Sequence, residues 1–224
     1  MIWVYAICDL PDLPLPRRRG LAQAPLAGIP EGGLVAVVTE HTNPPGEPAV
    51  DALWAHERVV ERLMADRAVL PLRFGTKLPD AAAMRAVLQA RAGEFTAMLA
   101  RVRGRVEVSV RAIGSGSPNG APEPEPAAPA SGREYLLAKL ALDQRGERQA
   151  AALHEPLAAL AVASRRGMPQ AAGEVLRASY LLERADLARF RDAVARLQRQ
   201  LPETAVLCTG PWPAYSFVGE GAIA

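Results

Sequence analysis

Three histidines are the side chains of this sequence best suited to acid–base or metal chemistry, and they are far apart: His41, His56 and His154. Imidazole titrates near neutral pH and binds zinc, so closely spaced histidines are a first sign of a catalytic or metal site. His56 is followed by Glu57, but no second histidine occurs four positions on, so the zinc-protease pattern is absent. We therefore expect each histidine to lie on the surface or on a helix face.

Nucleophiles and phosphate-binding loops give no stronger signal. Cys8 and Cys208 each lie in an apolar, strand-like run, which is typical of buried free thiols in a cytosolic protein. A disulfide between two paired terminal strands is the less favoured alternative. Gly114-Ser-Gly-Ser does not join a strand to a helix, so it is a poor phosphate loop. With no Gly-x-Ser-x-Gly elbow, Cys-x-x-Cys pair or dinucleotide fingerprint, we expect no catalytic residue, no metal and no cofactor.

Composition excludes several classes of partner. The chain has 224 residues, 50% of them hydrophobic, and a net charge of +2, so it can bury a core but lacks a strongly basic surface. The short run Arg17-Arg18-Arg19 is a weak indication of nucleic-acid binding. The apolar start, Met1 to Cys8, lacks preceding basic residues, and apolar runs stay far below the roughly 20 residues of a membrane span. We expect a soluble cytoplasmic protein that binds neither nucleic acid nor membrane.

The first half of the chain predicts two strands followed by alternating helix and strand. Strands are expected over residues 2–8 and 33–39, with a long loop over 9–30 between them. A helix starting near Pro48 has an apolar stripe that includes Val50, Leu53, Trp54, Val60, Leu63 and Met64. Residues 68–76 predict an irregular or edge strand because Pro71 interrupts it, and a helix follows from Asp80 to Gly104.

The second half continues with a cleanly alternating strand over residues 105–113. Residues 114–131 are rich in proline and glycine and lack bulky apolar side chains, which indicates a disordered insertion. A helical region over 134–166, kinked or divided at Pro156, is followed by a strand over 174–183, a helix over 186–200 and a strand over 205–209.

This order predicts an α/β (α+β) fold with two small sheet-and-helix domains, residues 1–103 and 104–224. At least the second domain is expected to be ferredoxin-like, with the insertion over 114–131 inside it and an ordered, aromatic C-terminal tail over 210–224.

Two segments stand out. The first is Val69-Leu-Pro-Leu-Arg-Phe-Gly-Thr76, and the second is Gly210-Pro-Trp-Pro-Ala-Tyr-Ser-Phe-Val218. In the first, Arg73 either pairs with a carboxylate inside the protein or faces a partner. In the second, three aromatics occur within six residues of a chain that is only 5% aromatic. Rings of this kind either lock two domains together or meet a partner.

Together these segments closely resemble the signatures of the gas-vesicle accessory GvpL/GvpF family. Tyr5 in the first strand, His56 upstream of the first segment and Tyr135-Leu136 at the start of the long helix occur in the matching order. The resemblance spans essentially the whole chain; residues 114–131 match no family motif.

The resemblance implies a non-enzymatic accessory or minor structural protein of the gas vesicle. Such a protein binds the small, very hydrophobic shell subunit and other accessory proteins and supports vesicle assembly. The family-motif residues, which are the candidate partner-binding residues, are Arg73, Phe74, Gly75, Thr76, Gly210, Pro211, Trp212, Pro213, Tyr215 and Phe217. The alternative is a small-molecule-binding or enzymatic ferredoxin-like module, which would need a pocket with converging polar groups.

Overall fold

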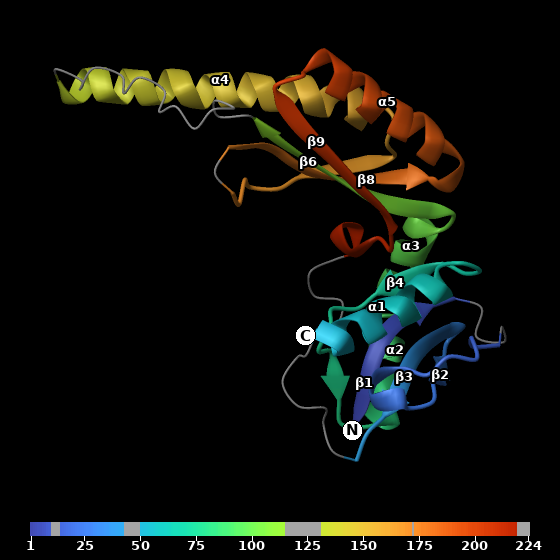
Figure 1. Cartoon of the computed structure of the whole chain (residues 1–224). Coiled ribbons are helices and arrows are strands. Elements are labelled where there is room, and N and C mark those ends of the chain that lie inside the picture. Colours follow the sequence, from blue (N-terminus) through green and yellow to red (C-terminus); the bar gives the residue numbers. More distant parts are fainter. Residues whose placement is uncertain (10–13, 43–49, 115–130, 172, 219–224) are drawn as a thin grey trace. The chain divides into compact units, whose positions relative to one another are not determined.

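The computed structural model describes residues 1–9, 14–42, 50–114, 131–171 and 173–218. These residues form two compact units (Figure 1). Unit 1 comprises Met1–Glu107 together with the chain from Trp212 onward, and unit 2 comprises Val108–Pro211. The predicted domains, 1–103 and 104–224, differ from these units chiefly in the segment from Trp212 onward, and the domain limits themselves stay a prediction. Residues 115–130, where an insertion is predicted, lie outside the described residues.

Unit 1 holds a five-stranded sheet whose central strand is β1 (Ile2–Cys8). β1 pairs antiparallel with β3 (Leu34–Glu40) along one edge and with two short strands along the other. The register against β3 shifts between Val4 and Ala6, so Tyr5 lies in a β-bulge. The other elements of unit 1 are η1 (Leu21–Gln23), β2 (Ala27–Glu31), α1 (Val50–Leu63), β4 (Val69–Pro71), β5 (Lys77–Leu78), α2 (Ala81–Ala90), α3 (Ala92–Val102) and η3 (Tyr215–Phe217).

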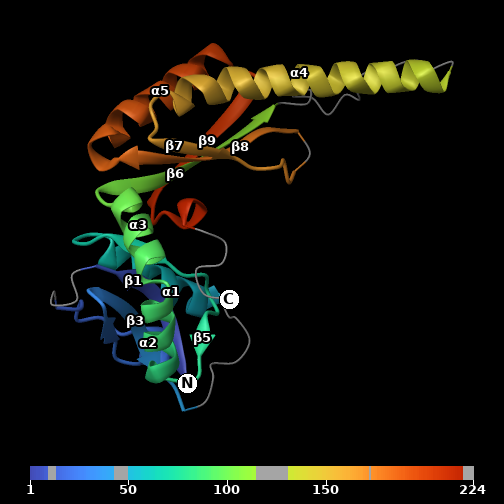
Figure 2. The same cartoon turned by 180° about the vertical axis from the view of Figure 1, so that it is seen from behind.

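Both faces of this sheet are covered by helices. α1 lies in front of the sheet in Figure 1, and α2 and α3 lie in front of it in Figure 2, which is the view from behind. The face under α1 buries Trp3, Tyr5 and Cys8 of β1 against Val59 and Leu63 of the helix. The continuously apolar pattern of β1 is therefore explained by a strand that is buried on both sides, as its sequence predicts.

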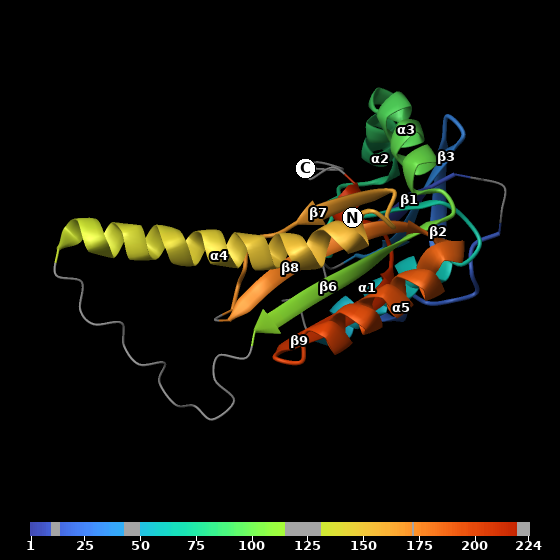
Figure 3. The ribbon, with the colours of Figure 1, turned by 90° about the horizontal axis from the view of Figure 1, so that it is seen from above.

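Unit 2 has the element order β6 (Arg105–Gly114), α4 (Gly132–Ala158), β7 (Ala163–Arg166), β8 (Glu174–Glu183), α5 (Leu187–Gln200) and β9 (Thr204–Trp212), with a short 3-10 turn η2 (Arg184–Asp186) before α5. The sheet order is β7-β8-β6-β9, and the two helices lie on one face of it (Figures 1 and 3). This βαββαβ order is that of a ferredoxin-like fold, which confirms the predicted class. Tyr180 and Phe190 lie at the centre of the core, with their ring centroids 5.1 Å apart.

Several predicted elements differ from those observed. The helical region expected over 134–166 ends at Ala158, and its last residues form the unpredicted strand β7 instead. β2 lies mostly in the segment expected to be a loop, and β5 lies between the strand expected over residues 68–76 and the helix expected from Asp80. The helix expected over 80–104 is two helices, because Arg91 leaves helical geometry at φ −119° and ψ 19°. Asp80 does cap the first of them, accepting a hydrogen bond from the Ala83 amide at 2.9 Å.

Candidate functional site

The first motif segment forms a turn along the edge of β1. The Leu72 amide donates to the Tyr5 carbonyl at 2.9 Å, and the Val4 amide donates to the Thr76 carbonyl at 3.0 Å. Between these points the Arg73 carbonyl accepts the Thr76 amide at 3.1 Å and the Thr76 hydroxyl at 2.7 Å. Gly75 has φ +97°, a conformation that side chains with a β-carbon rarely adopt. The turn therefore connects β4 to β5, which pair with the same edge of β1, and it passes the bulge at Tyr5.

This turn delivers Phe74 to an aromatic cluster, which we define as Trp3, Tyr5, His56 and Phe74. The ring centroids of Phe74 and Trp3 are 4.9 Å apart, and those of Phe74 and His56 are 5.7 Å apart in an edge-on arrangement. Tyr5 stacks on His56 with centroids 5.1 Å apart. The cluster brings together three residues that the sequence associates with the first motif, namely Tyr5, His56 and Phe74.

His56 is held as a neutral imidazole at the centre of this cluster. The Trp3 indole N–H, which can only donate, bonds to Nδ1 at 3.2 Å, and the Leu72 carbonyl, which can only accept, bonds to Nε2 at 3.0 Å. Burial lowers the pKa of His56 to about 4, while the Leu72 carbonyl opposes this shift. Because both ring nitrogens are engaged in hydrogen bonds, this histidine offers no free lone pair to a metal ion. Of the two positions expected for the histidines, His56 takes the helix face and not the surface, because it lies on the buried side of α1 and is 1% exposed.

The Tyr5 hydroxyl extends the network to the loop before β2. It accepts the Leu21 amide at 2.7 Å and bonds to the Thr39 hydroxyl at 3.0 Å. Thr39 in turn contacts His41 Nε2 at 2.8 Å. A β-carbon added at Gly20 would lie 2.3 Å from the Tyr5 hydroxyl oxygen, so this close approach requires glycine.

The second motif segment folds back onto unit 1. Residues Ala214, Phe217 and Val218 are buried, and Pro213 is buried beside them. The Tyr215 hydroxyl donates to Glu57 Oε2 at 2.8 Å. The amide and hydroxyl of Ser216 donate to the two carboxylate oxygens of Glu107 at 2.8 and 2.6 Å. These contacts fix the tail to α1 and to the start of β6.

The preceding part of the tail is the end of β9, which runs through Gly210 and Pro211 to Trp212 and is thus longer than the predicted strand. The Gly210–Pro211 peptide bond is cis, and the Gly210 carbonyl accepts a hydrogen bond from Arg191 Nη2 at 2.7 Å. Trp212 and Tyr215 are half-buried, whereas Phe217 is 3% exposed. Phe217 is therefore a core residue of unit 1.

Glu57 lies in an unusual environment for a helix-face carboxylate. Burial raises its pKa, the Tyr215 hydroxyl opposes that shift, and the nearby Glu61 adds to it. Within the described part of the chain, Glu57 Oε1 is buried without a hydrogen-bond partner. Burial and the neighbouring Glu57 also raise the pKa of Tyr215, so its hydroxyl remains a proton donor.

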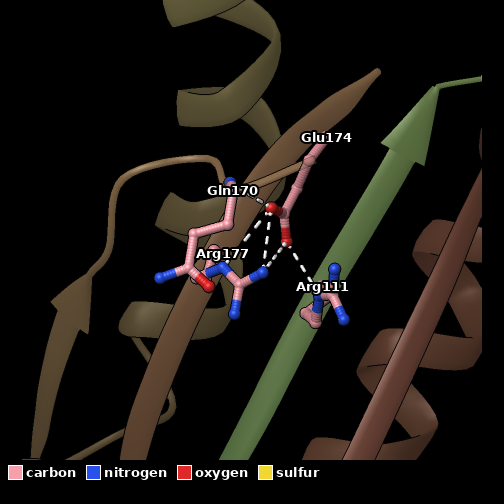
Figure 4. Close-up of polar contacts among 4 residues, drawn as sticks. All are labelled: Arg111, Gln170, Glu174 and Arg177. Atoms are coloured by element: carbon pink, nitrogen blue, oxygen red, sulfur yellow. Dashed lines mark hydrogen bonds and ion pairs between the residues drawn. The ribbon is translucent and has the colours of Figure 1, made fainter. Parts of the chain in front are cut away.

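Unit 2 contains a separate polar centre at Glu174, whose side chain is fully buried. Figure 4 shows its carboxylate between two guanidinium groups and a backbone amide. Oε1 accepts from Arg111 Nε at 2.8 Å, and Oε2 accepts from the Gln170 amide at 2.6 Å and from Arg177 Nη2 at 3.0 Å. The Gln170 amide, with the two arginines, lowers the pKa of Glu174 to about 2. This centre ties β6 to β8 and to the loop before β8.

His154 makes the contact in unit 2 that most resembles a catalytic arrangement. Its Nδ1 bonds to the buried Tyr180 hydroxyl at 2.9 Å, and Ser164 Oγ lies 3.5 Å from its Nε2. The Ser164 distance exceeds the roughly 2.6–3.2 Å expected between a nucleophile and its base. The contacts are accounted for by α4 packing on β7 and β8.

The structure places the predicted site residues on two sides of one helix. Phe74 of the first motif contacts His56 of α1, and Tyr215 of the second motif bonds to the adjacent Glu57. Arg73 is exposed at the start of its turn. A partner-binding role for the motif residues stays a prediction.

The sequence did not reveal the buried carboxylates Glu107 and Glu174, or the half-buried Glu57. An isolated glutamate on an apparent polar face gives no sequence signal, because solvation is the usual role of such a residue. Among the described residues, no three His, Cys, Asp or Glu side chains are grouped so that they could hold a metal ion. Nor does any described helix combine the length and apolar character that crossing a membrane requires.

The chain is similar to known proteins over most of its length. A family model described as "Gas vesicle synthesis protein GvpL/GvpF" matches residues 1–219. "Gas vesicle protein L" of Streptomyces sp. is 34% identical over 186 residues, covering 75% of this chain and 69% of that protein. "Gas vesicle protein F" of the same organism is 30% identical over 236 residues, covering 96% of this chain and 98% of that protein.

The fold is also that of solved structures. The crystal structure of gas vesicle protein GvpF from Microcystis aeruginosa superposes with a TM-score of 0.83, covering 97% of this chain and 98% of that one at 16% identity. GvpF from Anabaena gives a TM-score of 0.80 at 19% identity, with the same coverage. At these identities the structural likeness shows the fold, and the family follows from the sequence matches.

Proposed function

Because the chain belongs to the gas vesicle GvpL/GvpF family, we propose that it is a non-enzymatic accessory protein that binds the hydrophobic shell subunit and supports gas vesicle assembly. It acts at the vesicle and in the cytoplasm, together with other accessory proteins of the vesicle. The match of residues 1–219 to the family carries this proposal.

The surface of the described residues supports it. Two helices expose large apolar side chains at helical spacing: Val50, Leu53 and Trp54 on α1, and Leu136, Leu137 and Leu140 on α4. Exposed apolar patches drive association unless a partner covers them. A protein that carries such patches on soluble, well-packed units can hold an apolar subunit and keep it from aggregating.

The geometry of the polar centres also favours a binding role over catalysis. His56, Glu107 and Glu174 are buried and engaged by hydrogen bonds from within their own unit. These groups stabilise the fold and are not presented to a substrate.

The proposal is tested by expressing the vesicle genes with and without this chain and imaging cells by electron microscopy. In parallel, the purified chain is assayed for binding to the shell subunit fused to a soluble carrier. We expect vesicles to be lost or shortened without the chain, and the fused subunit to be retained by it. Normal vesicles without the chain, together with no retention of the subunit, would refute the proposal.

A further inference from the structure

The sheet of unit 2 ends in β7 on one side and β9 on the other, and the outer edge of each is a row of backbone groups that could pair with another strand. β7 is short and carries two exposed arginines, Arg165 and Arg166, which disfavour such pairing. In β9, residues 204–209 read Thr-Ala-Val-Leu-Cys-Thr and contain no charge, proline or glycine. Uncharged six-residue segments of this kind readily add strands from other chains. The edge of β9 therefore requires cover from elsewhere in the protein.

The side chain of Gln198, on α5, covers one end of this edge. Its Nε2 donates to the Thr204 carbonyl at 2.8 Å, and its Oε1 accepts the Val206 amide at 2.7 Å. In a parallel pair of strands, one residue bonds in this way to the carbonyl before and the amide after the residue opposite it. The carboxamide of Gln198 thus takes the place of a neighbouring strand opposite Ala205. Because the Val206 amide has a single hydrogen, which Gln198 engages, this edge is not the one that pairs with β6.

Arg191, about two helical turns before Gln198 on α5, covers the other end. Its Nη2 donates to the Gly210 carbonyl at 2.7 Å. The backbone groups of successive residues point alternately to the two edges of a strand, so Val206 and Gly210 face the same edge. By the same alternation Cys208, midway between them, also faces it. Two side chains of α5 therefore bond to the outer edge of β9 on either side of Cys208.

We propose that Gln198 and Arg191 keep β9 from pairing with a strand of another molecule, and that the strand they exclude is β9 of a second copy. Identical edges pair antiparallel about a two-fold axis, and every copy of the chain presents the same uncharged segment. Leu207, which is 53% exposed, would gain a cross-strand neighbour in such a pair. The inference concerns association of the chain with itself and is independent of the proposed function.

The test measures self-association of the full chain carrying Gln198→Ala and Arg191→Ala. Mass is determined by light scattering after size exclusion, at concentrations up to the order of 100 µM. We expect the double variant to form dimers or larger species whose share rises with concentration, and the wild type to show no such rise. In the associated variant, hydrogen exchange at the Cys208 amide should slow at least about tenfold relative to wild type, because pairing gives this outward amide an acceptor.

Two further variants separate an uncovered edge from a general loss of stability. Gln200→Ala with Arg196→Ala removes the same two types of side chain from exposed positions of the same helix, and should leave the mass unchanged. Gln198→Lys with Arg191→Ala gives up the same hydrogen bonds to β9 but places a charge beside its edge, so this variant should not associate.

A double alanine variant that keeps the mass and the circular dichroism spectrum of the wild type would overturn the proposal. Association that leaves exchange at Cys208 unchanged would also overturn it, because the contact would then lie elsewhere. Equal association of the lysine variant would do the same, since lost stability would then be the cause. If the double variant loses the wild-type spectrum, Gln198→Ala alone is measured in the same way and the same outcomes decide.

Discussion

His56 and Glu57 are consecutive residues of α1, yet each holds a different motif segment. His56 points into the core and contacts Phe74, while Glu57 accepts the Tyr215 hydroxyl at 2.8 Å. One helix therefore links two segments that lie far apart in the sequence. The pairing of these segments in one protein has a structural basis, because both complete the packing around α1.

Replacing His56 with alanine should destabilise unit 1 by about 3 kcal/mol. The substitution opens a cavity and leaves the Trp3 indole N–H and the Leu72 carbonyl without their partners. All three tryptophans belong to unit 1, so their fluorescence during urea unfolding reports on it. The exposed Arg58→Ala should change the stability by less than about 0.5 kcal/mol. Equal midpoints for His56→Ala and wild type would contradict the assigned contacts.

The stability of unit 1 should fall as the pH drops from about 6.5 towards 4. In this window the unfolded chain binds a proton at residue 56 that the folded protein, with a His56 pKa of about 4, does not bind. The folded state consequently loses about 3 kcal/mol relative to the unfolded state across the window, and the loss levels off below pH 4. His56→Gln, which can still accept from Trp3 and donate to Leu72, should remove this part of the pH dependence. Parallel pH curves for the two proteins would show that His56 does not carry it.

Truncating the buried side chain of Phe217, in the C-terminal tail, should lower the stability of unit 1 without removing a contact to a binding partner. We expect Phe217→Ala to cost about 3 kcal/mol because Phe217 is 3% exposed, and Tyr215→Phe to cost about 1 kcal/mol through the lost bond to Glu57. The half-exposed Leu207→Ala, on β9, serves as the control. The measurement is tryptophan fluorescence during urea unfolding. A neutral Phe217→Ala would mean that the tail does not pack on unit 1 in solution.

Glu174→Gln should loosen unit 2 while leaving unit 1 unchanged. The amide cannot accept on both sides, so Arg111 or Arg177 loses its bond, and hydrogen exchange at residues 173–177 should accelerate. A carboxyl with a lowered pKa stabilises the fold above its ordinary value of 4.5, and this contribution is lost as the pH falls towards 2. The destabilisation of unit 2 by Glu174→Gln should therefore stay constant from pH 7 to about pH 5. Unaltered exchange in the variant would rule out a stabilising role.

The elements predicted best from sequence are those whose hydrophobic pattern fits only one kind of secondary structure. β1 is apolar on both faces and is the central strand, and β6 alternates and buries Val106, Val108 and Val110. β7 was missed because Ala163-Ser-Arg-Arg has no apolar alternation and follows a leucine pattern that continues the helix. β2 contains glycine and proline, which are more typical of loops.

The candidate site was predicted less completely because it depends on long-range contacts. The first motif, Tyr5 and His56 were grouped by resemblance, but neither the bulge at Tyr5 nor the neutral form of His56 has a sequence signal. The apolar stripe expected on α1 is two opposite surfaces: Val60 and Leu63 are buried, while Val50 and Trp54 are exposed. Periodicity identified the helix but could not distinguish its core side from its exposed apolar side.

The packing of residues 212–218 on unit 1 determines when this unit can finish folding as the chain is translated. A ribosome completes Met1–Glu107 long before it adds Ser216, whose backbone and hydroxyl satisfy the buried Glu107 carboxylate. Until then the nascent unit 1 lacks Phe217 in its core and exposes the surface that this ring covers. The unit that is translated first is therefore finished late, when the whole of unit 2 has already been translated.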